Sequence, residues 1–381
     1  MLLFLVMKLG IDIVGSDHGR SGIGSYVQAL VQNLPEMEDV TYELFGAEVD
    51  RYTFNSNNEN IGYKSLNLPD SISGDRLWHM FRIKKFIRNN NYNALLFTAG
   101  SRVLPRMVEI PTVAVVNGVV SRVLKRKNDI WTSRMLIPGL KKVTKIIAAS
   151  QYIRKDLVNL GIDTKKIEVV HNGIDHSMFY PREQIDNSTV LIKPFSIKRP
   201  YIIYASRLSH EEKKHIQLIK AFTIFKKNTG LPHRLVLAGS NDSYAEKVHA
   251  VASKSPYASD IFLTGYFPHE NLPELYSCAD ACIFPSVMEG VGLPVLEAMA
   301  SGIPIAVAKA GALPEIAGDG ALYFNPDDIN EFAKVIEKII TDKKTRQTLI
   351  DYSLQWTERF SWVKTAEKTI EVIKKAIEIS K

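Results

Sequence analysis

The sequence has very few cysteines and no hydrophobic run long enough to cross a membrane. Cys278 and Cys282 are the only two cysteines among 381 residues. Their positions near apolar segments predict buried thiols and disfavour a disulfide or a cysteine metal site. The first six residues are apolar, but a spanning helix needs about 20 such residues, and a signal-peptide core is also longer. We therefore expect a cytosolic chain, with its first strand beginning near Met7.

Tandem repeats, low-complexity tracts, nucleic-acid recognition motifs and the Asp-x-Asp metal motif are also missing. Apolar residues make up 45% of the chain and charged residues 23%, which is ordinary for a globular protein of this length with two domains. The net charge is +7. This charge favours anionic partners such as sugar nucleotides, lipid phosphates or an anionic membrane face, and no nucleic acid is expected.

The stretch from Pro285 to Pro304, PSVMEGVGLPVLEAMASGIP, is the most informative in the sequence. An apolar run at 281–285 predicts a buried strand, and residues 295–300 predict a helix with Pro294 at its start. Gly290, Val291, Gly292 and Leu293 form a glycine-rich loop between them. Backbone N–H groups of such a loop, together with the positive end of a helix, can bind a phosphate.

Two glutamates flank this loop eight positions apart, Glu289 on the loop and Glu297 in the expected first helical turn. Carboxylates at these positions can accept hydrogen bonds from sugar hydroxyls while the loop amides hold phosphate. Acids at the start of a helix also complement its dipole, so a purely structural role is the alternative. The glycine loop, together with the helix-ending residues Gly302, Ile303 and Pro304, favours a nucleotide-sugar site.

This stretch resembles the Glu-x7-Glu donor motif of the retaining glycosyltransferases of family 4. The resemblance implies an α/β GT-B fold with two Rossmann-like, doubly wound parallel-sheet domains facing a cleft. It also implies a C-terminal helix that crosses back to the first domain. We expect an acceptor-side domain at 1–182, a linker at 183–199, a donor domain at 200–357 and the returning helix at 358–381. The segments KIEVVHNGID and HSMFYP, within 166–181, are similar to family landmarks that close the first domain.

In the first domain, a strand at 9–14 leads into a glycine-rich turn that contains Gly22 and Gly24. The resemblance implies that these glycines approach the donor phosphates and the acceptor, although glycines also serve ordinary tight turns. After the strand at 112–116, family members usually carry His-Asp, whereas this chain has Asn117-Gly118. Asn117 can donate and accept hydrogen bonds but cannot titrate. A simple strand-end turn is the alternative interpretation.

The most basic segment follows, at 121–145. Its charges are interleaved with apolar residues, among them Trp131. A solvated helix face is the default interpretation, and a surface that docks on an anionic membrane is the alternative. The basic residues are Arg122, Lys125, Arg126, Lys127, Arg134, Lys141, Lys142 and Lys145.

In the second domain, Arg207 and Lys213 bracket a loop that follows the strand at 201–205. Ligands bind at this end of the strands in doubly wound sheets. The resemblance implies that the two cations neutralise the diphosphate leaving group, with Lys214 as the rival of Lys213. It further implies that Gly239, Gly265 and Tyr266 lie along the donor nucleotide.

Together with these features, the resemblance predicts a retaining hexosyltransferase. It implies a GDP- or UDP-linked sugar donor, with mannose or glucose preferred, and an acceptor hydroxyl on a glycan or a lipid-linked sugar. It further implies a role in bacterial surface polysaccharide synthesis, in the cytoplasm or at the inner membrane face. No cofactor or metal is expected, because Asp-x-Asp is missing.

Three alternatives stay open. A sugar-nucleotide epimerase of the same fold would need cleft acids and histidines, of which His171 is the one candidate. The second alternative is a catalytically weak sugar-nucleotide-binding protein. The third is a pyridoxal-dependent phosphorylase, which the chain length disfavours.

Overall fold

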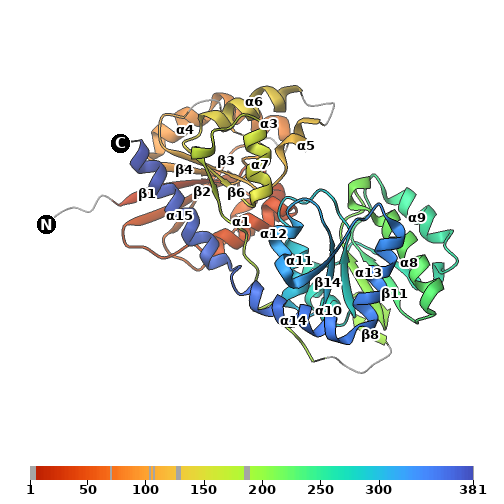
Figure 1. Cartoon of the computed structure of the whole chain (residues 1–381). Coiled ribbons are helices and arrows are strands. Elements are labelled where there is room, and N and C mark those ends of the chain that lie inside the picture. Colours follow the sequence, from red (N-terminus) through yellow and green to blue (C-terminus); the bar gives the residue numbers. More distant parts are fainter. Residues whose placement is uncertain are drawn as a thin grey trace. The chain divides into compact units, whose positions relative to one another are not determined.

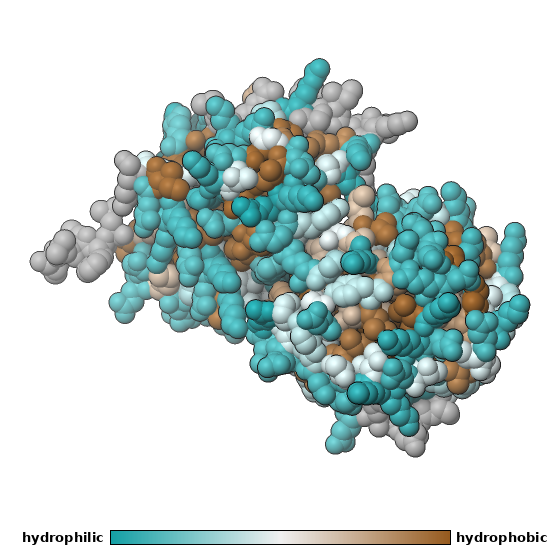
Figure 2. All heavy atoms as spheres, viewed as in Figure 1, coloured by the Kyte–Doolittle hydropathy of each residue, from teal (hydrophilic) through white to brown (hydrophobic). Residues whose placement is uncertain are grey.

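The computed structural model describes residues 6–68, 71–102, 104–105, 108–125, 130–183 and 189–380. The chain forms two compact units (Figure 1). Unit 1 comprises Met1–Gly173 together with Phe360–Lys381, and unit 2 comprises Ile174–Arg359. Hydrophilic side chains cover most of the visible face of each unit (Figure 2). No helix in the described part of the chain is long and apolar enough to span a membrane.

Unit 1 is built on a seven-stranded parallel sheet, counted over the described residues, with the order β3-β2-β1-β4-β5-β6-β7. The central strands β4 and β5 are buried at every position and apolar except for Thr112, as expected for a parallel sheet covered on both faces. The strands are β1 (Met7–Asp12), β2 (Val40–Ala47), β3 (Ile61–Leu66), β4 (Ala94–Phe97), β5 (Thr112–Val116), β6 (Lys145–Ala148) and β7 (Ile167–Val169).

Helices cover both faces of this sheet. On one face, the C-terminal helix α15 packs against α1 and the central strands, with Ile370 and Ile373 in the core (Figure 1). The returning C-terminal helix is therefore confirmed. On the other face, Phe45 meets Trp78 and Phe86 at ring distances of 6.1 and 5.0 Å. The helices are α1 (Gly22–Gln32), α2 (Asp50–Thr53), α3 (Ile72–Phe81), α4 (Ile83–Asn90), α5 (Val120–Lys125), α6 (Ile130–Lys142), α7 (Gln151–Asn159) and α15 (Trp362–Ile379), with 3₁₀ turns η1 (Asp17–Gly19) and η2 (Thr164–Lys166).

Unit 2 repeats the same plan, with a six-stranded parallel sheet over its described residues in the order β12-β11-β10-β13-β14-β15. The strand order reverses between β10 and β13, as it does between β1 and β4 in unit 1. Ligands of doubly wound sheets bind outside the carboxyl ends of the strands at this reversal. The strands are β10 (Tyr201–Ala205), β11 (Arg234–Ala238), β12 (Ile261–Gly265), β13 (Ala281–Phe284), β14 (Ile305–Ala308) and β15 (Ala321–Phe324).

The helices of unit 2 surround this sheet and include the two that follow its central strands, α8 and α11. They are α8 (His215–Thr229), α9 (Ala245–Ser253), α10 (Leu272–Ser277), α11 (Leu293–Ala300), α12 (Leu313–Ala317), α13 (Ile329–Thr341) and α14 (Lys343–Thr357), with 3₁₀ turns η3 (Glu211–Lys213), η4 (Ala258–Asp260), η5 (His269–Asn271) and η6 (Gly318–Gly320).

The segment predicted as a linker, 183–199, differs from expectation. Its described residues include an antiparallel hairpin of β8 (Thr189–Ile192) and β9 (Phe195–Lys198). Val190, Ile192 and Ile197 are buried, so the hairpin packs on unit 2. Apolar residues recur between 77 and 87 in a way that would suit one continuous helix, but α3 ends at Phe81 and α4 begins at Ile83 after a break at Arg82.

Candidate functional site

The charged residues predicted to hold the donor lie at the strand reversal of unit 2. Ser206 and Arg207 directly follow β10, and Glu289 lies in the loop after β13. Arg207 is exposed there, and its guanidinium has no hydrogen-bond or ion-pair partner among the described residues. The two adjacent parallel strands thus bring a free cation and a carboxylate loop to one edge of the sheet.

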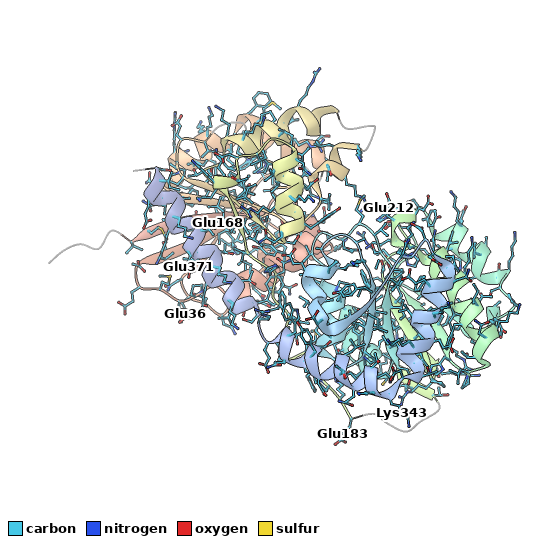
Figure 3. All side chains as sticks on the ribbon, viewed as in Figure 1. Glu36, Glu168, Glu183, Glu212, Lys343 and Glu371 are labelled. Atoms are coloured by element: carbon cyan, nitrogen blue, oxygen red, sulfur yellow. The ribbon has the colours of Figure 1, made fainter. Side chains whose placement is uncertain are left out.

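Lys213 and Glu289 form an ion pair within this edge. Lys213 Nζ lies 2.5 Å from Glu289 Oε1, and the two side chains are only 18% and 16% exposed. Lys213 ends the 3₁₀ turn η3, and its carbonyl accepts a hydrogen bond from Tyr204 at 3.0 Å. The preceding residue, Glu212 (Figure 3), accepts a bond from the Val287 N–H at 2.9 Å. The η3 turn and the glutamate loop are therefore tied together through backbone groups.

Lys214 takes a different direction. Its backbone is left-handed, with φ of 58°, and its ammonium lies 2.6 Å from Asp327 Oδ1. The two neighbouring lysines therefore serve different partners, and only Lys213 reaches the Glu289 carboxylate. The sequence could not separate them, because the left-handed turn between η3 and α8 decides where each side chain points.

Gly311 holds the backbone of Glu289 in place. Gly311 has a positive φ of 61°, and an added Cβ would lie 2.7 Å from the Glu289 carbonyl oxygen. The next residue, Ala312, donates its N–H to the same oxygen at 2.9 Å. Only glycine tolerates this approach together with this φ. Sequence analysis did not identify Gly311 as a site residue, although its Gly-Ala-Leu-Pro pattern marks a turn that opens a helix.

The glycine loop opens α11 as predicted, with Gly292 at the N-cap in a left-handed conformation, φ of 77°. No side chain caps this helix, so its first N–H groups suit an anion. One prediction is wrong in detail. The helix begins at Leu293, two residues earlier than expected, so Glu297 lies in the second turn and not in the first.

Glu297 is almost buried, at 8% exposed. The Tyr276 hydroxyl donates to its Oε2 at 3.4 Å, and His269 Nε2 lies 3.5 Å from its Oε1. The hydrogen bond to Glu297 raises the pKa of His269 above its ordinary value. His269 was missed from the sequence, since it lies on the short turn η5, far from the Glu-x7-Glu stretch, and no motif surrounds it.

The glycines assigned to the nucleotide occupy neighbouring loops. An added Cβ at Gly239 would lie 2.1 Å from the Ser206 carbonyl oxygen, so this loop must pass directly over the Arg207 loop. The Gly239 N–H donates to the Gly265 carbonyl at 3.1 Å. Gly265 has a φ of 71°, and the Tyr266 ring beyond it is 72% exposed. These residues line the sheet edge next to Arg207.

In unit 1, the glycine turn precedes α1, whose N-cap Ser21 accepts a bond from the Gly24 N–H at 3.3 Å. An added Cβ at Gly24 would lie 2.5 Å from Gly19 Cα, so tight packing alone requires glycine there. At Gly22 an added Cβ would meet nothing within 4 Å. Gly22 therefore faces open space, and packing does not explain why this position is a glycine.

Asn117 follows β5 and carries an unsatisfied amide. Its Oδ1 and Nδ2 atoms are both buried, and neither has a hydrogen-bond partner among the described residues. Buried amide atoms are nearly always paired in folded proteins. This position is therefore suited to a ligand group that supplies the missing hydrogen bonds.

Other predicted features are only partly described. Arg126 and Lys127 lie outside the described residues, and so does the side chain of Trp131, while Arg122 and Lys125 lie on α5. Cys278 and Cys282 are buried free thiols, and burial raises the pKa of both. Within the described part of the chain, no group of three or more histidine, cysteine, aspartate or glutamate side chains could hold a metal ion.

Several proteins similar in sequence to this chain are named as mannosyltransferases. The O-antigen chain mannosyltransferase B of Escherichia coli is 26% identical over 245 residues, which cover 64% of this chain and 64% of that protein. The MMP alpha-(1->4)-mannosyltransferase of Mycolicibacterium hassiacum is 28% identical over 247 residues, covering 62% and 55%. The matched segments span 64%, 51% and 66% of the first three curated relatives, less than two thirds of each.

Solved structures share the fold along almost the whole chain. Sucrose-phosphate synthase from Thermosynechococcus elongatus matches with a TM-score of 0.75 at 16% identity, covering 98% of this chain and all of that one (100%). HepE from Anabaena, in complex with UDP-glucose, matches with a TM-score of 0.72 at 18% identity, covering 97% and 100%. At such identities the likeness establishes the fold alone.

Family models account for both halves of the chain. The model "Glycosyltransferase Family 4" matches residues 20–178, and the model "Glycosyl transferases group 1" matches residues 191–356. The second match contains the Lys213–Glu289 pair and the α11 glycine loop. The chain therefore belongs to the GT-B glycosyltransferases, with a family 4 amino-terminal half and a group 1 carboxyl-terminal half.

Proposed function

We propose that this protein is a retaining glycosyltransferase that moves a hexose from a nucleoside diphosphate sugar to an acceptor hydroxyl. The observation that carries the proposal is the Lys213–Glu289 pair at the strand reversal of unit 2, with Arg207 at the carboxyl end of β10, the strand that pairs with β13. A donor needs cations for its diphosphate and a carboxylate for its sugar hydroxyls. At this edge of the sheet, Lys213 supplies a cation and Glu289 supplies a carboxylate, and the two form one ion pair.

Binding of the donor would separate the two members of this pair. Lys213 would turn to the diphosphate together with Arg207, and Glu289 would accept hydrogen bonds from the sugar. The amides of Gly290–Leu293 and the uncapped start of α11 would contact the phosphate. Glu297, held by Tyr276 and His269, would accept hydrogen bonds from the ribose hydroxyls. Positive charge near the leaving diphosphate stabilises the transition state as negative charge grows there.

The chemical step needs no side-chain base in this proposal. The bond between the anomeric carbon and the phosphate oxygen breaks, and the acceptor oxygen bonds to the same face of that carbon. The acceptor proton passes to a phosphate oxygen of the leaving diphosphate. Asn117 is compatible with this route because it needs only to donate or accept a hydrogen bond. We propose a metal-independent reaction, since the sequence lacks Asp-x-Asp.

The names of the relatives favour particular sugar donors and a particular biosynthetic process. Mannosyltransferases, one of them acting on O-antigen chains, support transfer of mannose from a GDP-linked donor in bacterial surface polysaccharide synthesis. The UDP-glucose in the HepE structure supports UDP-glucose as the second candidate donor. A cytoplasmic location with peripheral contact at the inner membrane face, through basic residues on α5, fits a lipid-linked acceptor.

A donor panel followed by product analysis tests the proposal. GDP-mannose, UDP-glucose and related donors are screened by thermal unfolding, and a donor at about 100 times its dissociation constant adds about 2.7 kcal/mol to stability. The donor that binds is then radiolabelled in the sugar and incubated with candidate acceptor glycans. Transfer to an acceptor, or slow hydrolysis of the donor, is expected. Isomerised donor would indicate an epimerase, and unchanged donor after binding would indicate a sugar-nucleotide-binding protein without activity.

A further inference from the structure

Two buried rings lie at the base of the loop that carries the donor-site cations. This cation loop comprises residues 206–213, with Arg207 near its start and Lys213 at its end. Tyr204, near the end of β10, and His215, the first residue of α8, are both 0% exposed. Their ring centroids lie 4.8 Å apart. Neither ring belongs to the site residues predicted from the sequence.

Tyr204 holds the end of the cation loop. Its hydroxyl donates a hydrogen bond to the Lys213 carbonyl at 3.0 Å. Burial raises the pKa of Tyr204 well above its ordinary value, and the Glu289 carboxylate raises it further. The hydroxyl therefore keeps its proton near pH 7 and stays a donor. This bond fixes the backbone position from which the Lys213 ammonium reaches Glu289.

His215 holds the start of the cation loop. Its Nε2 lies 3.3 Å from the Ser206 carbonyl oxygen. Burial lowers the pKa of His215 to about 4, so its ring is neutral near pH 7. Because a carbonyl oxygen can only accept, Nε2 carries the ring proton and donates the hydrogen bond. The Ser206 carbonyl belongs to the peptide bond that leads into Arg207, so this bond fixes the backbone where the Arg207 side chain begins.

The two hydrogen bonds cross at the base of the loop. Tyr204 precedes the cation loop and binds its last residue, whereas His215 follows the loop and binds its first residue. Leu208 is the only buried residue between Ala205 and His215. A loop with so few buried side chains has little packing of its own to fix its backbone. Its position therefore depends on bonds to its neighbours, and these two bonds close its ends.

We propose that Tyr204 and His215 are positioning residues of the donor site, which hold the cation loop so that its two cations face the donor diphosphate. This role rests on the glycosyltransferase function proposed above. Both side chains act through the loop and not by contact with the donor, because neither is accessible to solvent. Charges that are already in place when the diphosphate leaves stabilise the transition state without the cost of reorganising the site.

Removing the Tyr204 hydroxyl should lower turnover through Lys213. Tyr204→Phe keeps the ring and should lower kcat about ten-fold, with the donor KM changed less than about three-fold. In a Lys213→Ala background the same substitution should lose most of its effect, because the bond then positions no ammonium. Steady-state kinetics of the wild type, the two single variants and the double variant give this comparison. A residue that only supports the fold would lower kcat by the same factor in both backgrounds.

A conservative replacement separates the hydrogen bond of His215 from its packing. His215→Gln keeps a side-chain N–H donor of similar reach, so its kcat should stay within about three-fold of the wild type. His215→Leu fills the site without a donor and should lower kcat about ten-fold. Equal kcat values for these two variants would overturn the role of the bond to Ser206.

The matched control is Tyr201→Phe, in the same strand. Tyr201 is also 0% exposed, and its hydroxyl donates to the Leu275 carbonyl at 2.6 Å, at the opposite end of β10 from the cation loop. Tyr201→Phe should leave kcat and the donor KM unchanged. Each variant is first shown to be folded by its melting temperature. The role of Tyr204 is overturned if Tyr204→Phe has the kcat of the wild type, or if its loss is the same with and without the Lys213 ammonium.

Hydrogen exchange in the full chain without donor separates this role from the proposed function. Tyr204→Phe should speed exchange of the backbone amides of residues 206–214 at least about five-fold, and Tyr201→Phe should not. If the wild type neither transfers nor hydrolyses any sugar nucleotide, the glycosyltransferase function is contradicted, and the exchange result alone decides whether Tyr204 holds the loop. If the wild type is active but neither kcat nor exchange responds to Tyr204→Phe, the positioning role is contradicted and the function stands.

Discussion

Each unit has an ion pair near the strand reversal of its sheet, and the two pairs differ in burial: the pair in unit 1 is sealed from solvent, and the pair in unit 2, called the accessible pair below, is partly exposed. In unit 1, Asp12 and His79 lie 2.5 Å apart with 3% and 1% of their side chains exposed. In unit 2, Lys213 and Glu289 also lie 2.5 Å apart, with 18% and 16% exposed. A pair sealed from solvent can only hold structure together, whereas an accessible pair can exchange its partner for a ligand.

The difference follows from what covers each pair. His79 lies on α3, with Trp78 and Phe97 beside its ring, so α3 closes over the end of β1. Lys213 lies on a 3₁₀ turn before α8, and Glu289 lies on a glycine loop, so a short turn and a loop carry this pair, and its side chains stay 18% and 16% exposed. The reversal of strand order thus lies next to a buried, structural ion pair in unit 1 and next to a candidate ligand-binding site in unit 2.

Breaking the sealed pair should have the largest effect. Removing one partner of a buried ion pair costs about 3–5 kcal/mol, because the other charge stays buried without compensation. We expect His79→Ala to lower the free energy of unfolding by about this amount, measured by chemical denaturation. The matched variant Glu289→Gln, at the accessible pair, should cost clearly less stability than His79→Ala, because Lys213 and Glu289 keep some contact with solvent. Equal losses at the two pairs would remove the distinction between them.

The stability of the sealed pair should also depend on pH. Burial opposes the charged ring of His79, but the Asp12 carboxylate outweighs it and raises the pKa of His79. A group with a raised folded pKa stabilises the protein fully below its unfolded pKa, about 6.5 for histidine. The stabilisation is lost as the pH rises through the folded pKa. Denaturation from pH 6 upward should therefore narrow the gap between wild type and His79→Gln.

At the accessible pair, the expected loss is in turnover. Lys213→Ala and Arg207→Ala should each lower kcat by about 10²–10³, the usual effect of removing one group that stabilises transition-state charge. The matched control is Lys214→Ala, whose ammonium pairs with Asp327, and it should change kcat less than ten-fold. Steady-state kinetics with the donor found by the panel make this measurement. A larger loss for Lys214→Ala than for Lys213→Ala would contradict the assignment.

A smaller effect on turnover is expected at Asn117, whose buried side-chain amide has no hydrogen-bond partner among the described residues. Asn117→Ala removes about one neutral hydrogen bond, worth about 1 kcal/mol or roughly five-fold in rate. Asn117→His should leave the choice of donor unchanged. Turnover of wild type and both variants on one donor tests this. A wild type that binds donor without turnover, together with an active Asn117→His, would show that the natural residue disables the enzyme.

The smallest effect is expected at His269, which contacts Glu297 but is itself 61% exposed. Exposed ion pairs contribute about 0.2–1 kcal/mol. His269→Ala should therefore raise the donor KM less than about five-fold and leave kcat unchanged, because the pair positions a binding group. The hydrogen bond to Glu297 raises the pKa of His269, so the wild-type advantage should disappear as the pH rises through that pKa. A pH-independent difference would indicate packing, not charge.

Some strands and part of the candidate site could be predicted from the sequence. Two strands match their expected bounds, Thr112–Val116 and Tyr201–Ala205. Both are predominantly apolar runs between turn signals, a pattern that depends on neighbouring residues alone. The glycine loop before α11 and the cation loop after β10 were predictable for the same reason, since each motif is contiguous.

The rest depended on contacts between segments far apart in the chain. Nothing near His269 in the sequence indicates that its ring meets Glu297. The sequence by itself therefore determined the alternation of strands and helices and the glycine-rich turns, because local periodicity and backbone freedom control these. The tertiary structure alone decided which lysine reaches Glu289 and which ion pair is sealed, because partner choice and burial depend on how distant segments pack.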